Sequence, residues 1–192
     1  MNTDTRLLVR ETETQREVQL ESGEAFFDVA QDLHRPFVVT AGNRKVMALG
    51  TSFVIRRDPQ QLVVTLMEGK VAVTSAGRAA QAESTVLSPG QRITFNERAA
   101  PQVDAPLLEK VTAWRRGEVV LDKTRLQDAV TEMNRYSGVK LRIDDQEVAD
   151  IPVSGIFRAG DSVRFARAVG ETYHLSVEEE SRGIVISRPM QR

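Results

Sequence analysis

The sequence predicts two domains of different fold class. The first is mostly β, a twisted antiparallel β-solenoid or sandwich, and the second is a small open α/β sandwich. Three observations support this prediction. Apolar residues recur with period two from Thr5 to Asn96. A stretch around Pro101 and Pro106 fits neither strand nor helix periodicity. After Trp114, short β-branched runs alternate with helical patterns.

The first domain is assigned to residues 1–104, and about eight to ten strands with little helix are expected in it. Its strand signals are short runs that alternate or are rich in β-branched residues, separated by Gly, Pro, Asn and Asp. These runs are REVQL (16–20), PFVVT (36–40), LVVTL (62–66), KVAVT (70–74) and QRITF (91–95).

Four glycines punctuate the strands of this domain. Each is predicted to open a strand at a corner, because glycine accepts positive φ and close backbone approach. The segment ALGTSFVIR (48–56) contains one such glycine and no catalytic side chain, so it is interpreted as a corner of the scaffold. The residues assigned structural roles are Gly23, Gly50, Thr51, Phe53, Gly69, Pro89, Gly90 and Trp114.

Residues 105–113 are predicted to be a linker, and residues 114–192 the second domain with element order β-α-β-β-α-β-β. A strand at 118–122 precedes a helix. Thr124 and Gln127 have capping-box spacing there, and Gly138 can form the C-cap. The apolar stripe of this helix is Leu126, Ala129, Val130, Met133 and Tyr136.

Further strands are predicted at 139–143 and 153–157. Asp161 or Ser162 is expected to cap a second helix that runs to about Tyr173. LSVEE (175–179) and GIVIS (183–187) are predicted to close the domain as a hairpin.

Composition excludes several function classes. Of 192 residues, 26 are Lys or Arg and 27 are Asp or Glu, so the net charge of −1 gives no positive field for nucleic acid or an anionic membrane. The chain has no cysteine, which removes disulfides and thiolate chemistry. No apolar run approaches the roughly 18 residues of a membrane span, and the polar N-terminus does not resemble a signal peptide.

The sequence offers little support for an enzyme. His34 and His174 fall in different predicted domains, so neither a shared base nor a multi-histidine metal centre is indicated. The acidic runs Asp144–Asp145 and Glu178–Glu180 place neighbours on opposite strand faces, and both are interpreted as solvated turns. Phosphate-binding and nucleophile-elbow motifs are absent. We therefore expect no catalysis and no cofactor.

Trp114, Arg115 and Arg116 form the one aromatic and basic cluster of note. Trp114 is predicted to pack between the domains and the two arginines to be exposed. An interaction hot spot remains the alternative, since Trp and Arg are enriched at such spots.

Several segments together resemble the FecR family of bacterial transmembrane anti-sigma regulators. These are GEAFFDVAQDLHRPFVV (23–39), ALGTSFVIR (48–56), VTLMEGKVAV (64–73), LSPGQR (87–92), AWRRGEVVLDKTRLQDAVTEMNRYS (113–137) and VSGIFRAGD (153–161). The resemblance implies that the chain is the periplasmic region of a single-pass inner-membrane protein, with a cytoplasmic anti-sigma segment and a membrane helix before it. It also implies that residues 114–192 are similar to an STN signalling module.

The resemblance further implies the partners. The periplasmic region would bind the signalling domain of an outer-membrane TonB-dependent siderophore transducer and relay the signal to a cytoplasmic ECF sigma factor that controls iron-uptake genes. An exposed sheet edge can pair with a partner strand. The candidate partner-binding residues lie in VSGIF and GIVIS and are Val153, Ile156, Phe157, Ile184, Val185 and Ile186.

Three alternatives stay open from the residues alone. GIVIS is apolar on both faces, which equally fits a central strand. The chain could also be an envelope or glycan-binding module, although only 5% of its residues are aromatic. A hydrolase with dispersed carboxylates is the third alternative.

Overall fold

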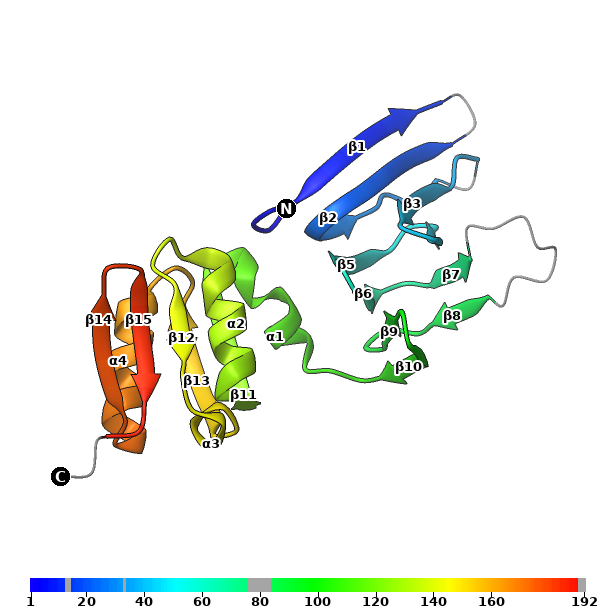
Figure 1. The fold of residues 1–192 in the computed structure, drawn as a ribbon. Coiled ribbons are helices and arrows are strands. Elements are labelled where there is room, and N and C mark those ends of the chain that lie inside the picture. Colours follow the sequence, from blue (N-terminus) through cyan, green and yellow to red (C-terminus); the bar gives the residue numbers. More distant parts are fainter. Residues whose placement is uncertain (13–14, 33, 76–83, 190–192) are drawn as a thin grey trace. The chain divides into compact units, whose positions relative to one another are not determined.

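The computed structural model describes residues 1–12, 15–32, 34–75 and 84–189. The chain divides into two compact units, Met1–Val111 and Thr112–Arg192, which are described separately (Figure 1). The stretch predicted as a linker contains a helical turn, α1 (Leu108–Thr112), and a 3₁₀ turn, η1 (Ala113–Arg116), follows it.

Unit 1 is built from strands. They are β1 (Arg6–Glu11), β2 (Arg16–Asp28), β3 (Phe37–Ala41), β4 (Arg44–Ala48), β5 (Ser52–Asp58), β6 (Gln61–Glu68), β7 (Val71–Ser75), β8 (Thr85–Leu87), β9 (Arg92–Asn96) and β10 (Ala99–Asp104). The predicted mostly β character of this unit is confirmed, and each of the five predicted runs overlaps an observed strand.

These strands form one curled, open sheet in the order β10-β9-β6-β5-β2-β3-β4-β7-β8, with β1 added along β2. β2 links the two halves of the sheet, because residues 16–20 pair with β3 and residues 23–28 pair with β5. The pairing of β2 with β3 is parallel, so the prediction of a wholly antiparallel sheet is wrong there. The cause is the connection after β2, which returns the chain to the starting end of that strand before β3 begins.

Gly23 lies inside β2, where the strand passes between the two halves, rather than at a strand start as predicted. Its φ is +86°, and a Cβ at this position would lie 2.5 Å from Cα of Thr5. Glycine is therefore required by both the backbone angle and the close approach of the N-terminal segment.

The core of unit 1 follows from the period of two. Along β6, Leu62, Val64 and Leu66 are buried on the concave side. Aromatic rings from three segments fill the centre: Phe27 stacks on Phe53 with ring centroids 5.1 Å apart and contacts Phe37 at 5.7 Å. Burial of these side chains from both halves of the curled sheet stabilises the unit.

The Gly50–Thr51 corner is part of the scaffold. Gly50 has a φ of +71°, and Thr51 after it is buried and accepts a hydrogen bond from the backbone N–H of Val29 at 3.0 Å. Gly69 packs against the same corner, because a Cβ on Gly69 would lie 2.7 Å from Cγ2 of Thr51. The predicted positive φ is confirmed at both glycines and at Gly90 (+84°), which follows Pro89 in the turn before β9.

Unit 2 combines two small sheets with helices. Its elements after η1 are β11 (Glu118–Arg125), α2 (Leu126–Tyr136), β12 (Leu141–Ile143), α3 (Gln146–Ala149), β13 (Pro152–Arg158), α4 (Ser162–Tyr173), β14 (Ser176–Glu180) and β15 (Gly183–Ser187). The strands and the two longer helices follow the predicted order, and the short helix α3 was not predicted. β11 pairs with β13, whereas β12, β15 and β14 form a separate sheet.

One hydrophobic core joins all the layers of unit 2. The predicted stripe of α2 is buried from Leu126 to Met133, and α4 contributes Phe165 and Val169. Gly170 within α4 has a packing reason, because a Cβ there would lie 2.6 Å from Cγ2 of Val177 on β14. Because Gly170 has no side chain, α4 can lie close against β14 at this point.

The ends of the two helices differ in how well they were predicted. Asp161 is the N-cap of α4, and its side chain accepts from the backbone N–H of Arg164 at 3.1 Å, as expected. The capping box of α2 is wrong: the N-cap is Arg125, and the hydroxyl of Thr124 contacts the backbone of Asp122 instead. Ser137 follows α2 in an extended conformation, so Gly138 does not form the predicted C-cap.

Candidate partner-binding surface

The strand GIVIS, β15, is the centre of its sheet and not an edge. It pairs in parallel with β12 on one side and antiparallel with β14 on the other. Ile184, Val185 and Ile186 are all buried. The prediction that these residues bind a partner by strand addition is therefore wrong, because the backbone groups that an added strand needs are already paired. The alternative of a central strand is confirmed.

The strand VSGIF, β13, does offer an edge. Within the described residues it pairs only with β11, so one of its sides has no neighbouring strand. Its side chains alternate: Val153 is buried and Phe157 packs edge-on against Phe165 with ring centroids 4.9 Å apart. Ile156 points to the opposite face and is 66% exposed. Of the predicted contact residues, Ile156 alone presents its side chain to solvent, while Val153 and Phe157 serve the core.

The outward face of this two-stranded sheet has a small apolar centre between charges. Val120 of β11 stands directly opposite Ile156, and Glu118 opposite Arg158. Glu118 also forms an exposed ion pair with Arg116 at 3.1 Å. An apolar pair flanked by both signs of charge is suited to contact with another protein, where apolar contact and a polar rim occur together. Val120 was not among the predicted contact residues, although its neighbour Val119 fits the inward-facing position of an alternating strand.

β11 is distorted beside this face. The register between β11 and β13 shifts after Leu121, and Lys123 adopts a left-handed conformation with a φ of +45°. The backbone N–H of Lys123 donates to Oγ of Ser154 at 2.9 Å, which holds the bulge against β13. Bulges of this kind redirect side chains and limit pairing at sheet edges.

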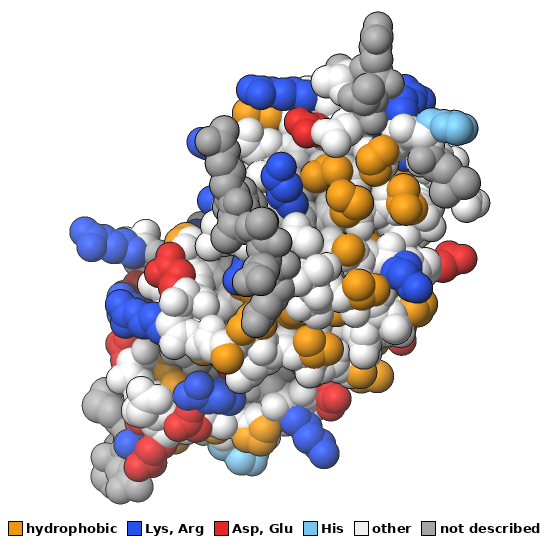
Figure 2. Space-filling view, turned by 90° about the vertical axis from the view of Figure 1, so that its right-hand side faces the viewer, with side chains coloured by type: hydrophobic (Ala, Val, Ile, Leu, Met, Phe, Trp, Pro, Cys, Tyr) orange, Lys and Arg blue, Asp and Glu red, His pale blue; other side chains and the backbone are white. Residues whose placement is uncertain are grey.

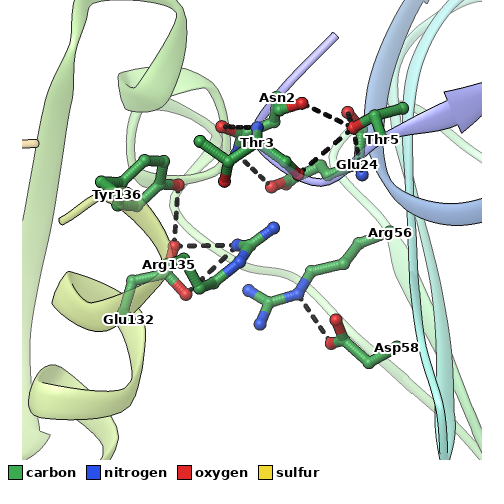
Figure 3. A network of polar contacts seen from close by, with 9 residues as sticks. All are labelled: Asn2, Thr3, Thr5, Glu24, Arg56, Asp58, Glu132, Arg135 and Tyr136. Carbon is green, nitrogen blue, oxygen red and sulfur yellow. Dashed lines mark hydrogen bonds and ion pairs between the residues drawn. The ribbon is translucent and has the colours of Figure 1, made fainter. Parts of the chain in front are cut away.

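Ion pairs form at the end of β11 and on α2, and they differ in exposure. Arg125 at the end of β11 contacts Asp150, and the hydrogen bonds and charge of that carboxylate raise the pKa of the guanidinium. On α2, Tyr136 donates to Glu132 at 2.9 Å, and Arg135 donates to the same carboxylate at 3.0 Å (Figure 3). The Arg125–Asp150 pair is more than half exposed and contributes little stability, whereas the side chains of Arg135 and Glu132 are mostly buried, at 15% and 25% exposure.

Unit 1 has a polar network of its own at the start of the chain. The side-chain amide of Asn2 donates to the buried carboxylate of Glu24 at 2.6 Å, and the hydroxyl of Thr5 donates to the carbonyl of Glu24 at 2.9 Å (Figure 3). The N-terminal residues are thereby fixed on the bend of β2.

A second face also carries exposed hydrophobic groups. Figure 2 shows a band of hydrophobic side chains interrupted by Lys and Arg. Unit 1 leaves Leu8, Val9, Met47 and Val86 exposed.

The remaining sequence candidates are dispersed. The backbone N–H of His34 donates to Asp32, and His174 ends α4 in a left-handed conformation. Asp145 caps α3 through the backbone N–H of Glu147 instead of joining an acid pair with Asp144. In the part of the chain that the structure describes, no three metal-binding side chains gather.

Trp114 lies in η1, and its indole N–H is buried without a hydrogen-bond acceptor among the described residues. Arg115 and Arg116 beside it are exposed, as expected. The role of Trp114 in packing between the domains stays a prediction.

Known proteins resemble this chain in part of its sequence and in its fold. Residues 1–72 match the family described as FecR protein. Two crystal structures of a candidate anti-sigma factor from Parabacteroides distasonis ATCC 8503 have TM-scores of 0.79 and 0.78, at 24% identity, over 99% of this chain and 89% of that chain. Because the identity is low, this likeness shows the fold. No curated protein matches the chain, and none of the described helices is long and apolar enough to span a membrane.

Proposed function

We propose that this chain, whose residues 1–72 carry a FecR-family domain, is the sensor region of an anti-sigma regulator. The family match is the observation that carries the proposal. Unit 2 lies beyond the residues that match the family. For this unit, support comes from the fold that nearly the whole chain shares with a candidate anti-sigma factor. Signalling proteins of this kind act by binding, which fits a structure whose candidate residues do not assemble a catalytic group.

In finer detail, the region would lie in the periplasm and bind the signalling domain of an outer-membrane TonB-dependent siderophore transducer. Another segment of the regulator would hold the ECF sigma factor in the cytoplasm and so control iron-uptake transcription. Unit 2 would be the STN-like module. Its βαββαββ order and its open β11–β13 sheet support this assignment.

The contact would form along β13. An extended strand of the transducer domain can add to the open side of β13, with main-chain hydrogen bonds supplying affinity. Ile156 and Val120 would lie against the same partner and supply apolar contact, while Glu118 and Arg158 would set its register by charge. This arrangement leaves the buried residues of β13 in the core.

The experiment is calorimetric titration of the chain with purified signalling domains of TonB-dependent transducers. Saturable 1:1 binding to one domain is expected. Ile156→Lys should weaken that binding by about tenfold or more, because a charge on the outward face opposes apolar contact and strand addition. Val139→Lys is the matched control, since Val139 is also an exposed apolar residue of unit 2, at 43%, but lies outside β13.

Three results would contradict the proposal or part of it. If no folded transducer domain binds, the family match would indicate the fold but not this function. If envelope polysaccharides bind instead, the glycan-binding alternative would be favoured. Equal weakening by both lysine variants, with unchanged circular dichroism, would place the contact away from β13.

A further inference from the structure

Two arginines of unit 1 reach the same end of the curled sheet from its two halves. Arg57 of β5 and Phe95 of β9 flank Leu62 of β6 in register, so the three side chains share the inward face. Arg44 opens β4 in the other half of the sheet, and its guanidinium lies over the Phe95 ring. Both cations are therefore on the concave side.

Arg44 is held by the ring and not by an acid. Its Cζ lies 4.3 Å from the centroid of Phe95, in the geometry of a cation–π contact. Its Nε is buried and has no hydrogen-bond acceptor among the described residues. A buried N–H of a charged group without an acceptor is unfavourable, because the donor loses its hydrogen bond to water and forms none with the protein.

Arg57 reaches toward the turn that precedes Arg44. Its Nη1 donates to the carbonyl oxygen of Leu20 at 2.9 Å. A Cβ on Gly42, in the turn between β3 and β4, would lie 3.6 Å from Nη2 of Arg57. Leu20 and Arg44 each pair with Ala41 of β3, so the guanidinium of Arg57 lies near the start of β4.

No carboxylate in the described ranges forms a salt bridge with either arginine, although acids partner other arginines of unit 1. Asp58, the residue next to Arg57, is taken by Arg56 at 2.8 Å. Arg35 pairs with Asp32, and Arg92 pairs with Asp104. Two like charges close together and partly removed from water repel each other, and an anion between them would relieve both costs.

We infer that Arg44 and Arg57 form a binding site for an oxyanion, a carboxylate or a phosphate group. The planar guanidinium presents paired donors that match the two oxygens of such a group. Leu20 occupies one donor of Arg57 and Phe95 orients Arg44, which leaves the outer donors of both side chains for the ligand. The site belongs to unit 1 alone and does not depend on the proposed partner of unit 2.

The test is titration of the chain with inorganic phosphate and, separately, with acetate at low ionic strength. The readout is the NMR signals of the arginine side-chain Nε–H groups. Saturable shifts are expected for Arg44 and Arg57. Arg44→Gln and Arg57→Gln should each weaken binding by about tenfold or more, since each removes charged donors to the anion.

Arg6→Gln is the matched control, because Arg6 is an exposed arginine of the same unit on β1. Arg6→Gln should leave the affinity for phosphate and acetate unchanged. Arg57→Lys keeps the charge without the paired donors and should give intermediate affinity, which tests the site if Arg44→Gln does not fold. Absence of saturable shifts for both anions, or equal weakening by Arg6→Gln, would overturn the inference. Tighter binding of acetate would identify a carboxylate ligand, and tighter binding of phosphate a phosphate ligand.

Discussion

Gly50 and Gly90 have similar φ angles but differ in what surrounds them. Both have a positive φ, +71° and +84°. A Cβ on Gly50 would lie 2.9 Å from Cβ of Gln31 and 3.1 Å from its Cα, whereas a Cβ on Gly90 would meet nothing within 4 Å. Sequence periodicity predicted a corner at both positions. The crowding at Gly50 comes from a segment almost 20 residues earlier, so the sequence did not reveal it.

We predict that Gly50→Ala is far more damaging than Gly90→Ala. Gly50→Ala combines left-handed strain with overpacking against Gln31 and should destabilise unit 1 by about 2–4 kcal/mol. Gly90→Ala introduces only the backbone strain and should lower the free energy of unfolding by about 1 kcal/mol. Urea unfolding followed by circular dichroism measures both. Equal losses would show that crowding at the Gly50 corner contributes nothing.

At the scale of elements, the two long helices of unit 2 show where local sequence rules hold. The cap of α4 depends on residues within one turn and the apolar stripe of α2 on residues within a few turns, and both were predicted correctly. The capping box at Thr124 failed because β11 continues through Thr124 and Arg125 to pair with Val153 and Pro152. Helix α2 therefore begins at Leu126, one residue later than the capping box requires, and the N-cap position falls on Arg125, whose side chain makes no cap hydrogen bond.

This difference predicts the effect of two alanine variants. Asp161→Ala removes a side chain that accepts from the first turn of α4, and it should destabilise unit 2 by about 1 kcal/mol. Thr124→Ala removes no cap of α2 and should change stability by less than about 0.5 kcal/mol. Thermal unfolding of both variants in one buffer compares them. A larger loss of stability in Thr124→Ala than in Asp161→Ala would show that Thr124 does cap α2.

The open edge of unit 2 is also a property of elements. VSGIF and GIVIS have similar composition, yet β13 has one strand neighbour and β15 has two. Strand order depends on pairing between segments far apart in the chain, and no local pattern encodes it. This is why Ile156 remains a candidate contact residue and Ile184, Val185 and Ile186 do not.

At the scale of the whole molecule, each unit has its own hydrophobic core. The cluster of unit 1 is drawn from the curled sheet, and that of unit 2 from α2, α4 and both small sheets. Separate cores permit separate folding. The predicted boundaries, 1–104 and 114–192, stand as a proposal beside the observed division after Val111.

We predict that a fragment of residues 112–192 folds by itself. It should give a dispersed NMR spectrum and one cooperative urea transition, because all its core residues lie within the fragment. A fragment of residues 112–182 lacks the central strand β15 and should not fold. A collapsed spectrum for the longer fragment would show that unit 2 depends on unit 1.

Local patterns in the sequence predicted the features that depend on near neighbours in the chain. The period of two, the corners at Gly50, Gly69 and Gly90, the α2 stripe and the order of the strands and longer helices in unit 2 could be predicted, because each follows from patterns over a few residues. The tertiary structure alone decided the bend of β2 at Gly23, the parallel pairing of β2 with β3 and the central place of β15. It also brought Arg44 and Arg57 to one end of unit 1. Each of these depends on contacts between distant segments. Local patterns are compatible with several arrangements of such segments, and packing and strand pairing stabilise one of them.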